Sequence, residues 1–147
     1  MAEKQRFDLT KTAPDAFKAF LHIEEIVKQS KFDPMLKHLV KLRVSQINGC
    51  AFCVDMHIRE ARADGEDQKR LDQLVVWQHV GLFSPAEKAA FAWAEALTTK
   101  GAASALDPLH AALQAYFDDD DIALLTLVVV MINNWNRLQI AAGYSAF

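Results

Sequence analysis

Helix start signals recur along the whole chain, and they constrain its fold more than any other feature of the sequence. Each combines residues favoured in the first turn of a helix, and they stand at Pro14-Asp15, Asp33-Pro34, Ser84-Pro85-Ala86-Glu87, Asp107-Pro108 and Asp118 to Asp121. Short polar side chains cap the free amides of a first turn, and proline suits the first helical position. No segment shows the sustained apolar–polar alternation of a strand. The sequence therefore predicts an all-α fold.

Apolar residues three and four positions apart extend these signals into predicted helices. The helices are expected from Pro14 past Val27, from Asp33-Pro34 to Ile47, from about Cys50 to Asp64, from Glu66 to His79, from Ser84 through Leu97, from near Asp107-Pro108, and from the acidic run at 118–121 to about Ala142. Asn48-Gly49 and Gly65 separate neighbouring helices, because glycine readily adopts the left-handed conformation that ends one. We expect one domain over residues 1–147, a bundle of about six to seven helices with its core motif at 33–64.

Composition and charge narrow the classes of function. Hydrophobic residues make up 52% of the chain, and the formal net charge is −3 with no basic stripe, so we expect no nucleic-acid partner. The longest apolar run, Ile122 to Ile132, is shorter than the roughly 20 residues of a membrane span, so we expect no membrane partner. The first residues, MAEKQRF, lack the apolar segment of a signal peptide, which predicts a cytoplasmic protein.

The predicted last helix is apolar around most of its circumference. Its apolar residues include Leu124, Leu125, Leu127, Val128, Val129 and Val130. Such a helix has to be covered on nearly every side. Because a chain of 147 residues offers few helices for this, we expect part of the surface to be buried in a homo-oligomer.

Two cysteines and a histidine form the most informative motif. Cys50, Cys53 and His57 follow one another at spacings of three and four, so on a helix they lie on one face. At that spacing two cysteine Cα atoms come within about 5.5 Å, which permits a disulfide. His57 can accept a thiol proton, and the helix dipole can stabilise a Cys50 thiolate, so the spacing does not decide which sulfur attacks. The motif predicts attack of a thiolate on a peroxide oxygen, then condensation of the sulfenic acid with the second thiol.

Two other interpretations of the motif remain open. Free cysteines are often inert apolar residues, and a single histidine is often structural. Zinc is a sharper alternative, but Cys50 and His57 are seven residues apart, about 10 Å along a helix axis, which is too far to share one ion easily. Cys53 and His57 with ligands from elsewhere could still hold zinc. We expect neither a metal nor a cofactor.

The stretch LVKLRVSQINGCAFCVDMH, residues 39–57, resembles the core of the alkylhydroperoxidase D (AhpD)-like proteins, which belong to the carboxymuconolactone decarboxylase superfamily. The resemblance continues through Phe83-Ser84, Ala92 to Thr98 and Asn134 to Leu138. It implies an all-helical homo-oligomer, often a trimer or hexamer, that reduces hydroperoxides with the cysteine pair. In the best-known members of the family the electrons come from a lipoyl-bearing protein. By this resemblance Cys53 is the peroxidatic cysteine, Cys50 the resolving cysteine and His57 the proton relay.

The chain departs from the family pattern at positions near this chemistry. The family usually has a glutamate twelve residues before the first cysteine, where this chain has His38. A second common glutamate is replaced by His79, and the residue before the second cysteine is Phe52. We hypothesise that His38 takes the place of the glutamate, either by accepting a proton when neutral or by stabilising a thiolate when charged.

The sequence thus predicts a peroxidase or dithiol oxidoreductase that reduces alkyl or hydrogen peroxide in antioxidant defence. Its expected partners are a hydroperoxide substrate and a dithiol or lipoyl-type electron donor. The alternatives are a carboxymuconolactone decarboxylase-like enzyme, which would have no need of a dithiol, and a non-enzymatic redox or metal sensor.

Overall fold

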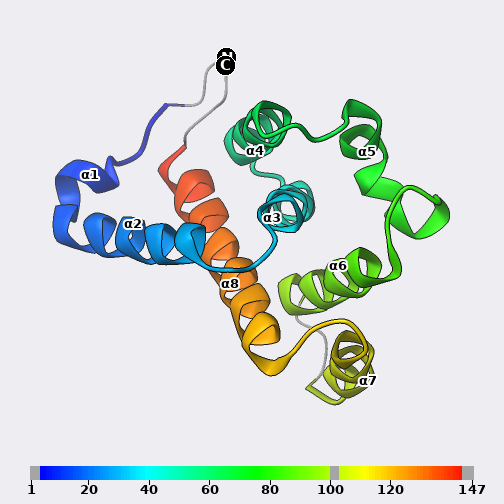
Figure 1. Ribbon diagram of the computed structural model, residues 1–147. Coiled ribbons are helices and arrows are strands. Elements are labelled where there is room, and N and C mark those ends of the chain that lie inside the picture. Colours follow the sequence, from blue (N-terminus) through cyan, green and yellow to red (C-terminus); the bar gives the residue numbers. More distant parts are fainter. Residues whose placement is uncertain (1–3, 100–102, 144–147) are drawn as a thin grey trace.

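Helices account for all the regular secondary structure in residues 4–99 and 103–143, the residues that the computed structural model describes (Figure 1). The elements are α1 (Leu9–Thr12), α2 (Pro14–Gln29), α3 (Pro34–Asn48), α4 (Ala51–Ala63), α5 (Gln68–Gln73), the 3₁₀ helix η1 (Leu74–His79), α6 (Pro85–Thr98), α7 (Ala103–Gln114) and α8 (Asp119–Ala142). The predicted all-α fold is confirmed. The described helices outnumber the six to seven predicted, partly because α1 is a single turn, too short to show an apolar repeat.

Two predicted helix boundaries are wrong. The helix expected over 66–79 is divided: α5 ends at Gln73, η1 follows from Leu74, and Val76 inside η1 leaves helical geometry with φ −119° and ψ 28°. The helix expected from near Asp107-Pro108 is already formed at Ala103, so Pro108 lies inside α7. Pro108 cannot donate to the carbonyl of Ser104, but Ser104 lies in the exposed first turn of α7, where water can satisfy that carbonyl.

Side-chain caps fix the helix ends that position the motif. The Oδ1 atom of Asp33 accepts hydrogen bonds from the first turn of α3, at 2.8 Å from the amide of Met35. Ser84 and Glu87 form the predicted capping box at the start of α6. Gly49 ends α3 with φ 71°, a left-handed conformation that glycine adopts without strain. The chain therefore turns sharply just before Cys50.

Helix α3 lies at the centre of the bundle, where it contacts α4, α6, α8 and η1 (Figure 1). Its apolar side chains are almost fully buried: Leu36, Leu39, Val40, Leu42 and Val44. The main core cluster joins them to apolar residues of α6 and α8. Because α3 is fixed on several sides, the turn that follows it, and with it the start of α4, has a well-defined place.

Helix α8 is covered mostly by its own chain. It contacts α2, α3, α4, α6 and α7, and Leu125, Val128, Val129 and Ile132 are at most 1% exposed. Val130 and Ile140 remain 48% and 44% exposed. The chain thus covers most of α8 but leaves these apolar side chains uncovered, and a homo-oligomer stays a prediction. In the described part of the chain no helix is both long and apolar enough to cross a membrane.

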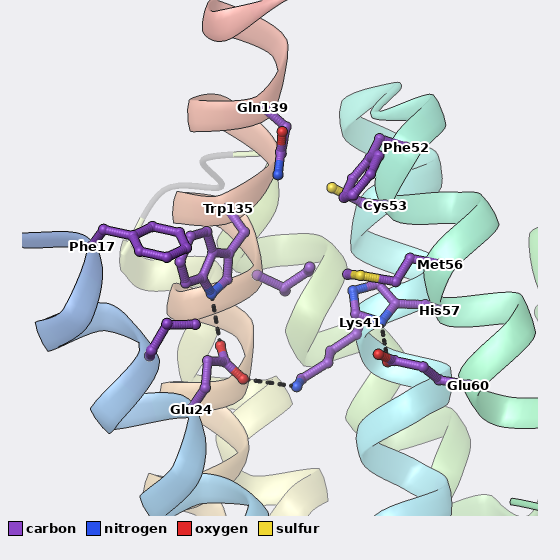
Figure 2. A pocket seen from close by; sticks show the side chains of 12 residues that line it. Phe17, Glu24, Lys41, Phe52, Cys53, Met56, His57, Glu60, Trp135 and Gln139 are labelled. Carbon is purple, nitrogen blue, oxygen red and sulfur yellow. Dashed lines mark hydrogen bonds and ion pairs between the residues drawn. The ribbon is translucent and has the colours of Figure 1, made fainter. Parts of the chain in front are cut away.

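Trp135 joins α2 to α8. Its indole ring makes an edge-on contact with Phe17 of α2, with ring centroids 5.9 Å apart (Figure 2). A second edge-on contact joins it to Phe20, at 5.6 Å. Its Nε1 atom donates a hydrogen bond of 2.9 Å to Oε1 of Glu24, also on α2. Aromatic contacts of this geometry add to the burial of the rings, so α2 is held beside α8.

A buried amide network ties the turn before Cys50 to α8. The Nδ2 atom of Asn48 donates to the side-chain oxygens of Asn133 and Asn136, each at 3.0 Å. Asn136, which is fully buried, in turn donates to Oγ of Ser45 at 3.0 Å. Buried polar groups that are all paired fix one arrangement of the elements that carry them. The network accordingly sets the position of the α3–α4 turn.

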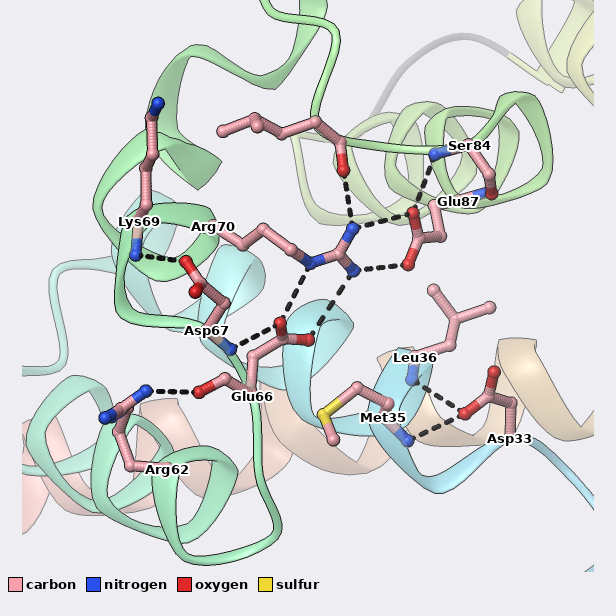
Figure 3. Close-up of polar contacts among 11 residues, drawn as sticks. Asp33, Met35, Leu36, Arg62, Glu66, Asp67, Lys69, Arg70, Ser84 and Glu87 are labelled. Atoms are coloured by element: carbon pink, nitrogen blue, oxygen red, sulfur yellow. Dashed lines mark hydrogen bonds and ion pairs between the residues drawn. The ribbon is translucent and has the colours of Figure 1, made fainter.

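Arg70 holds three segments together, and its replacement is expected to destabilise the fold. Its guanidinium bonds the buried carboxylate of Glu66 at 2.8 Å, Glu87 at 2.6 Å and the carbonyl of Leu82 (Figure 3). Arg70→Leu would leave Glu66, whose side chain is 5% exposed, without its main counter-charge. Breaking a buried ion pair costs about 3 kcal/mol. The free energy of unfolding from denaturant titration should fall by that amount.

The matched control is Arg59→Leu. Arg59 pairs with Asp55 on the surface of α4, where both side chains are well exposed. Exposed pairs contribute less than about 1 kcal/mol, so this variant should unfold nearly as the wild type does. Equal decreases in the free energy of unfolding of the two variants would contradict a stabilising role for Arg70.

Candidate active site

The two cysteines and His57 lie together at the start of α4. Cys50 is the N-cap residue of α4, and its Sγ accepts a hydrogen bond from the amide of Cys53 at 3.3 Å. The structure joins the cysteines by a disulfide, with Cα atoms 5.3 Å apart. All three side chains are at most 4% exposed. The predicted geometry of the motif, one helical face with the sulfurs within disulfide reach, is present.

A mostly apolar cavity of about 340 Å³ opens between α2, α4 and α8 beside this motif (Figure 2). Its lining residues are Phe17, Leu21, Glu24, Lys41, Phe52, Cys53, Met56, His57, Glu60, Ile132, Trp135 and Gln139. Cys53 and His57 line it, whereas Cys50 is not among the lining residues. A molecule in the cavity would therefore meet the sulfur of Cys53.

His57 has a ring nitrogen that is free to accept a proton. Its Nδ1 atom lies 3.2 Å from Oε2 of Glu60, and its buried Nε2 has no hydrogen-bond partner among the described residues. Burial lowers the pKa of His57 below its ordinary value of 6.5, outweighing the hydrogen bond to Glu60, so the imidazole is neutral at pH 7. An ionised carboxylate only accepts hydrogen bonds, so the proton is on Nδ1 and Nε2 carries the lone pair.

Glu60 is a site residue that the sequence analysis missed. The hydrogen bond from His57 lowers the pKa of Glu60 below its usual range, which keeps this carboxylate ionised at neutral pH. It lies three residues after His57, so the spacing of one helical turn was a signal that could have identified it. In this chain Glu60 fixes the orientation of the imidazole.

A second polar group lines the same cavity. Glu24 accepts hydrogen bonds from Nζ of Lys41 at 3.0 Å and from Nε1 of Trp135 at 2.9 Å. The positive charge of Lys41 also lowers the pKa of His57. Glu24 could not be identified from the sequence, because Glu24 lies on α2, far from the cysteine motif along the chain.

The structure places His38 in a neighbouring cavity. Its Nε2 atom lies 2.6 Å from Oδ2 of Asp64, and the two residues line a more polar cavity of about 710 Å³ together with Lys41 and Glu60. His38 is not among the residues that line the Cys53 cavity, and a positive charge on His38 would lower the pKa of His57. Glu60 lines both cavities, as do Leu21, Glu24 and Lys41, so the two cavities are neighbours that share one wall.

The remaining departures from the family pattern have separate places. Phe52 lines the cavity beside Cys53, and His79 ends η1 as an exposed residue. Within residues 4–99 and 103–143, no group of three or more histidine, cysteine, aspartate or glutamate side chains is arranged to hold a metal ion.

Comparisons with known proteins give a consistent set of relatives. The model of the carboxymuconolactone decarboxylase family matches residues 14–96. The uncharacterized protein YdfG of Bacillus subtilis is 37% identical over 142 residues, which cover 97% of each chain. The uncharacterized protein YnjA of Escherichia coli is 33% identical over 120 residues, 81% of this chain and 65% of that protein.

A solved structure is similar to nearly the whole chain. It is a protein of unknown function from Agrobacterium tumefaciens, assigned provisionally to antioxidant defence as an AhpD protein. The TM-score is 0.92 at 36% sequence identity, and the match covers 98% of this chain and 99% of that one.

Proposed function

Because the chain belongs to the carboxymuconolactone decarboxylase family as an AhpD-like member, we propose that it is a dithiol peroxidase that reduces alkyl or hydrogen peroxide. The observation that carries the proposal is the position of Cys53, which lines an apolar cavity one helical turn from a neutral, buried imidazole. A thiol needs a base to become the nucleophilic thiolate. The unpaired Nε2 of His57 is such a base.

In the first step His57 takes the proton of the Cys53 thiol on Nε2. The thiolate attacks the terminal oxygen of the hydroperoxide, so an S–O bond forms as the O–O bond breaks. The leaving alkoxide takes the proton back from His57 and departs as an alcohol. Cys53 is then a sulfenic acid, oxidised by two electrons.

In the second step Cys50 resolves the sulfenic acid. Its sulfur attacks the sulfur of Cys53, water leaves, and the disulfide seen in the structure forms. The 5.3 Å between the two Cα atoms lets this occur without a large backbone movement. Turnover then requires an external reductant, for which we propose a dithiol or lipoyl-type donor.

The remaining residue roles and assembly are part of the same proposal. Glu60 orients His57, and His38 takes the place of the family's usual glutamate, by accepting a proton when neutral or by its charge when protonated. A homo-oligomer, trimeric or hexameric, is the assembly that the family resemblance implies, and we propose that it is cytoplasmic. A decarboxylase is the alternative function, because the family takes its name from one. The cysteine pair beside the cavity weighs against it, because decarboxylation does not use a dithiol.

The proposal is tested by counting free thiols in the reduced protein before and after one equivalent of cumene hydroperoxide. We expect rapid loss of both thiols and an intramolecular disulfide by mass spectrometry. Cumyl alcohol, which has the same body without the O–O bond, is the control and should leave both thiols free. Two thiols that survive the hydroperoxide would contradict a peroxidase and favour the decarboxylase.

A further inference from the structure

A second buried polar atom without a partner belongs to a residue that lines the Cys53 cavity. Besides Nε2 of His57, the side-chain oxygen Oε1 of Gln139 has no hydrogen-bond partner among the described residues. Buried polar atoms are nearly always paired, so each unpaired one calls for an explanation. Both of these atoms belong to residues that line the same cavity. A bound molecule that carries hydrogen-bonding groups would satisfy both.

Gln139 faces the reacting sulfur from the opposite wall. It lies on α8, one turn after Trp135, whereas Cys53 lies on α4 across the cavity (Figure 2). The position of Trp135 is fixed by Phe17 and Glu24. Gln139 is therefore carried by a helix face whose orientation toward α4 is held by packing.

The other polar side chains that line this cavity already have partners. Glu24 is bonded to Lys41 and to Trp135, and Glu60 is bonded to His57. Most of the remaining wall is apolar, with Phe17, Leu21, Met56 and Ile132 among its residues. Gln139 thus offers a hydrogen-bonding group that is not engaged in the fold.

We propose that Gln139 is a substrate-binding residue that orients the hydroperoxide group at Cys53, an inference that rests on the proposed peroxidase function. The terminal O–H of a hydroperoxide donates to the amide oxygen of Gln139. The amide N–H₂ of the same side chain donates to the inner oxygen, which becomes the leaving alkoxide. A carboxamide supplies both an acceptor and donors. It would hold the O–O bond in line with the attacking sulfur while the apolar wall holds the organic body.

The test compares Gln139→Leu with Gln114→Leu. Both variants replace glutamine by leucine, but Gln114 is exposed on α7 and does not line the cavity. We expect the rate of Cys53 oxidation by cumene hydroperoxide to fall about tenfold in Gln139→Leu, the effect of one hydrogen bond to a developing charge. Gln114→Leu should react at the wild-type rate. Stopped-flow tryptophan fluorescence or quenched thiol titration measures these rates.

A second reagent separates substrate binding from thiol activation. Iodoacetamide alkylates the thiolate and has no O–O bond to orient, so its rate with reduced Gln139→Leu should match that of the wild type. If alkylation falls as much as oxidation, Gln139 acts on the thiol, and the inference is overturned. Gln139→Met, which keeps an unbranched side chain, replaces the leucine variant if circular dichroism shows that variant to be unfolded.

The outcomes distinguish the two proposals. A wild type that is oxidised as fast as Gln139→Leu would overturn the role of Gln139 and leave the peroxidase function intact. A wild type that does not react with the hydroperoxide at all would overturn both. A slower oxidation by hydroperoxide in Gln139→Leu, with alkylation at the wild-type rate, supports both proposals.

Discussion

Cys53→Ser is expected to abolish reaction with hydroperoxide, whereas Cys50→Ser should keep the first oxidation step and stop there. Cys53 lines the cavity beside His57, and Cys50 caps α4 away from it. A serine hydroxyl remains un-ionised at neutral pH, so replacing the nucleophile should lower the rate by several orders of magnitude. Without Cys50 the sulfenic acid at Cys53 has no resolving thiol and should persist. The two cysteines are thus expected to have different roles, Cys53 as the nucleophile and Cys50 as the resolving thiol.

Mass spectrometry after one equivalent of cumene hydroperoxide distinguishes the variants. Cys50→Ser should gain about 16 Da and react with dimedone, as a sulfenic acid does. Cys53→Ser should remain unmodified. Circular dichroism of both reduced variants controls for folding, because each cysteine is buried. The reverse pattern, with oxidation of Cys50 in Cys53→Ser and an inert Cys50→Ser, would show that attack does not occur from the cavity.

The features predicted from sequence are those that short-range chemistry determines. The helix caps at Asp33 and Ser84 depend on residues two or three positions away. The alignment of Cys50, Cys53 and His57 depends on helical spacing alone. The boundary at Asp107-Pro108 was wrong because α7 already begins at Ala103, and the residues before it, Gly101-Ala102, carry no capping side chain that would mark a helix start.

The rest of the site depends on contacts between distant segments. Glu24, Trp135 and Gln139 come to the cavity from α2 and α8, and no periodicity within those helices shows that they face α4. The surroundings of His38 also depend on contacts between separate helices. A position twelve residues before a cysteine suggests a role, but the structure gives the place beside His57 to Glu60 and pairs His38 with Asp64.

His57→Asn is expected to lower the oxidation rate of Cys53 by about 10²- to 10⁴-fold, the usual contribution of a general base. The pKa of His57 is lowered below 6.5 by burial, so its base form is present at pH 7. In the wild type the oxidation rate should therefore stay constant from neutral pH to below 6.5. It should fall as the pH drops through the lowered pKa of His57, and this decrease is the acid limb of the pH profile. His57→Asn should lack this acid limb. A pH profile of thiol oxidation, measured in both proteins, checks the sign and the position of the limb.

Glu60→Gln tests whether the carboxylate of Glu60 controls the protonation of the His57 imidazole. The hydrogen bond and charge of Glu60 raise the pKa of His57 against burial, so their loss should lower that pKa further and move the acid limb to lower pH. The rate at pH 7 should fall as well, because a glutamine amide can donate to Nδ1 and no longer fixes its proton there. Asp55→Asn neutralises an exposed carboxylate on the same helix, outside the cavity lining, and should leave the limb unchanged. An acid limb that moves equally in both variants would mean that general surface charge, and not the Glu60–His57 contact, controls the base.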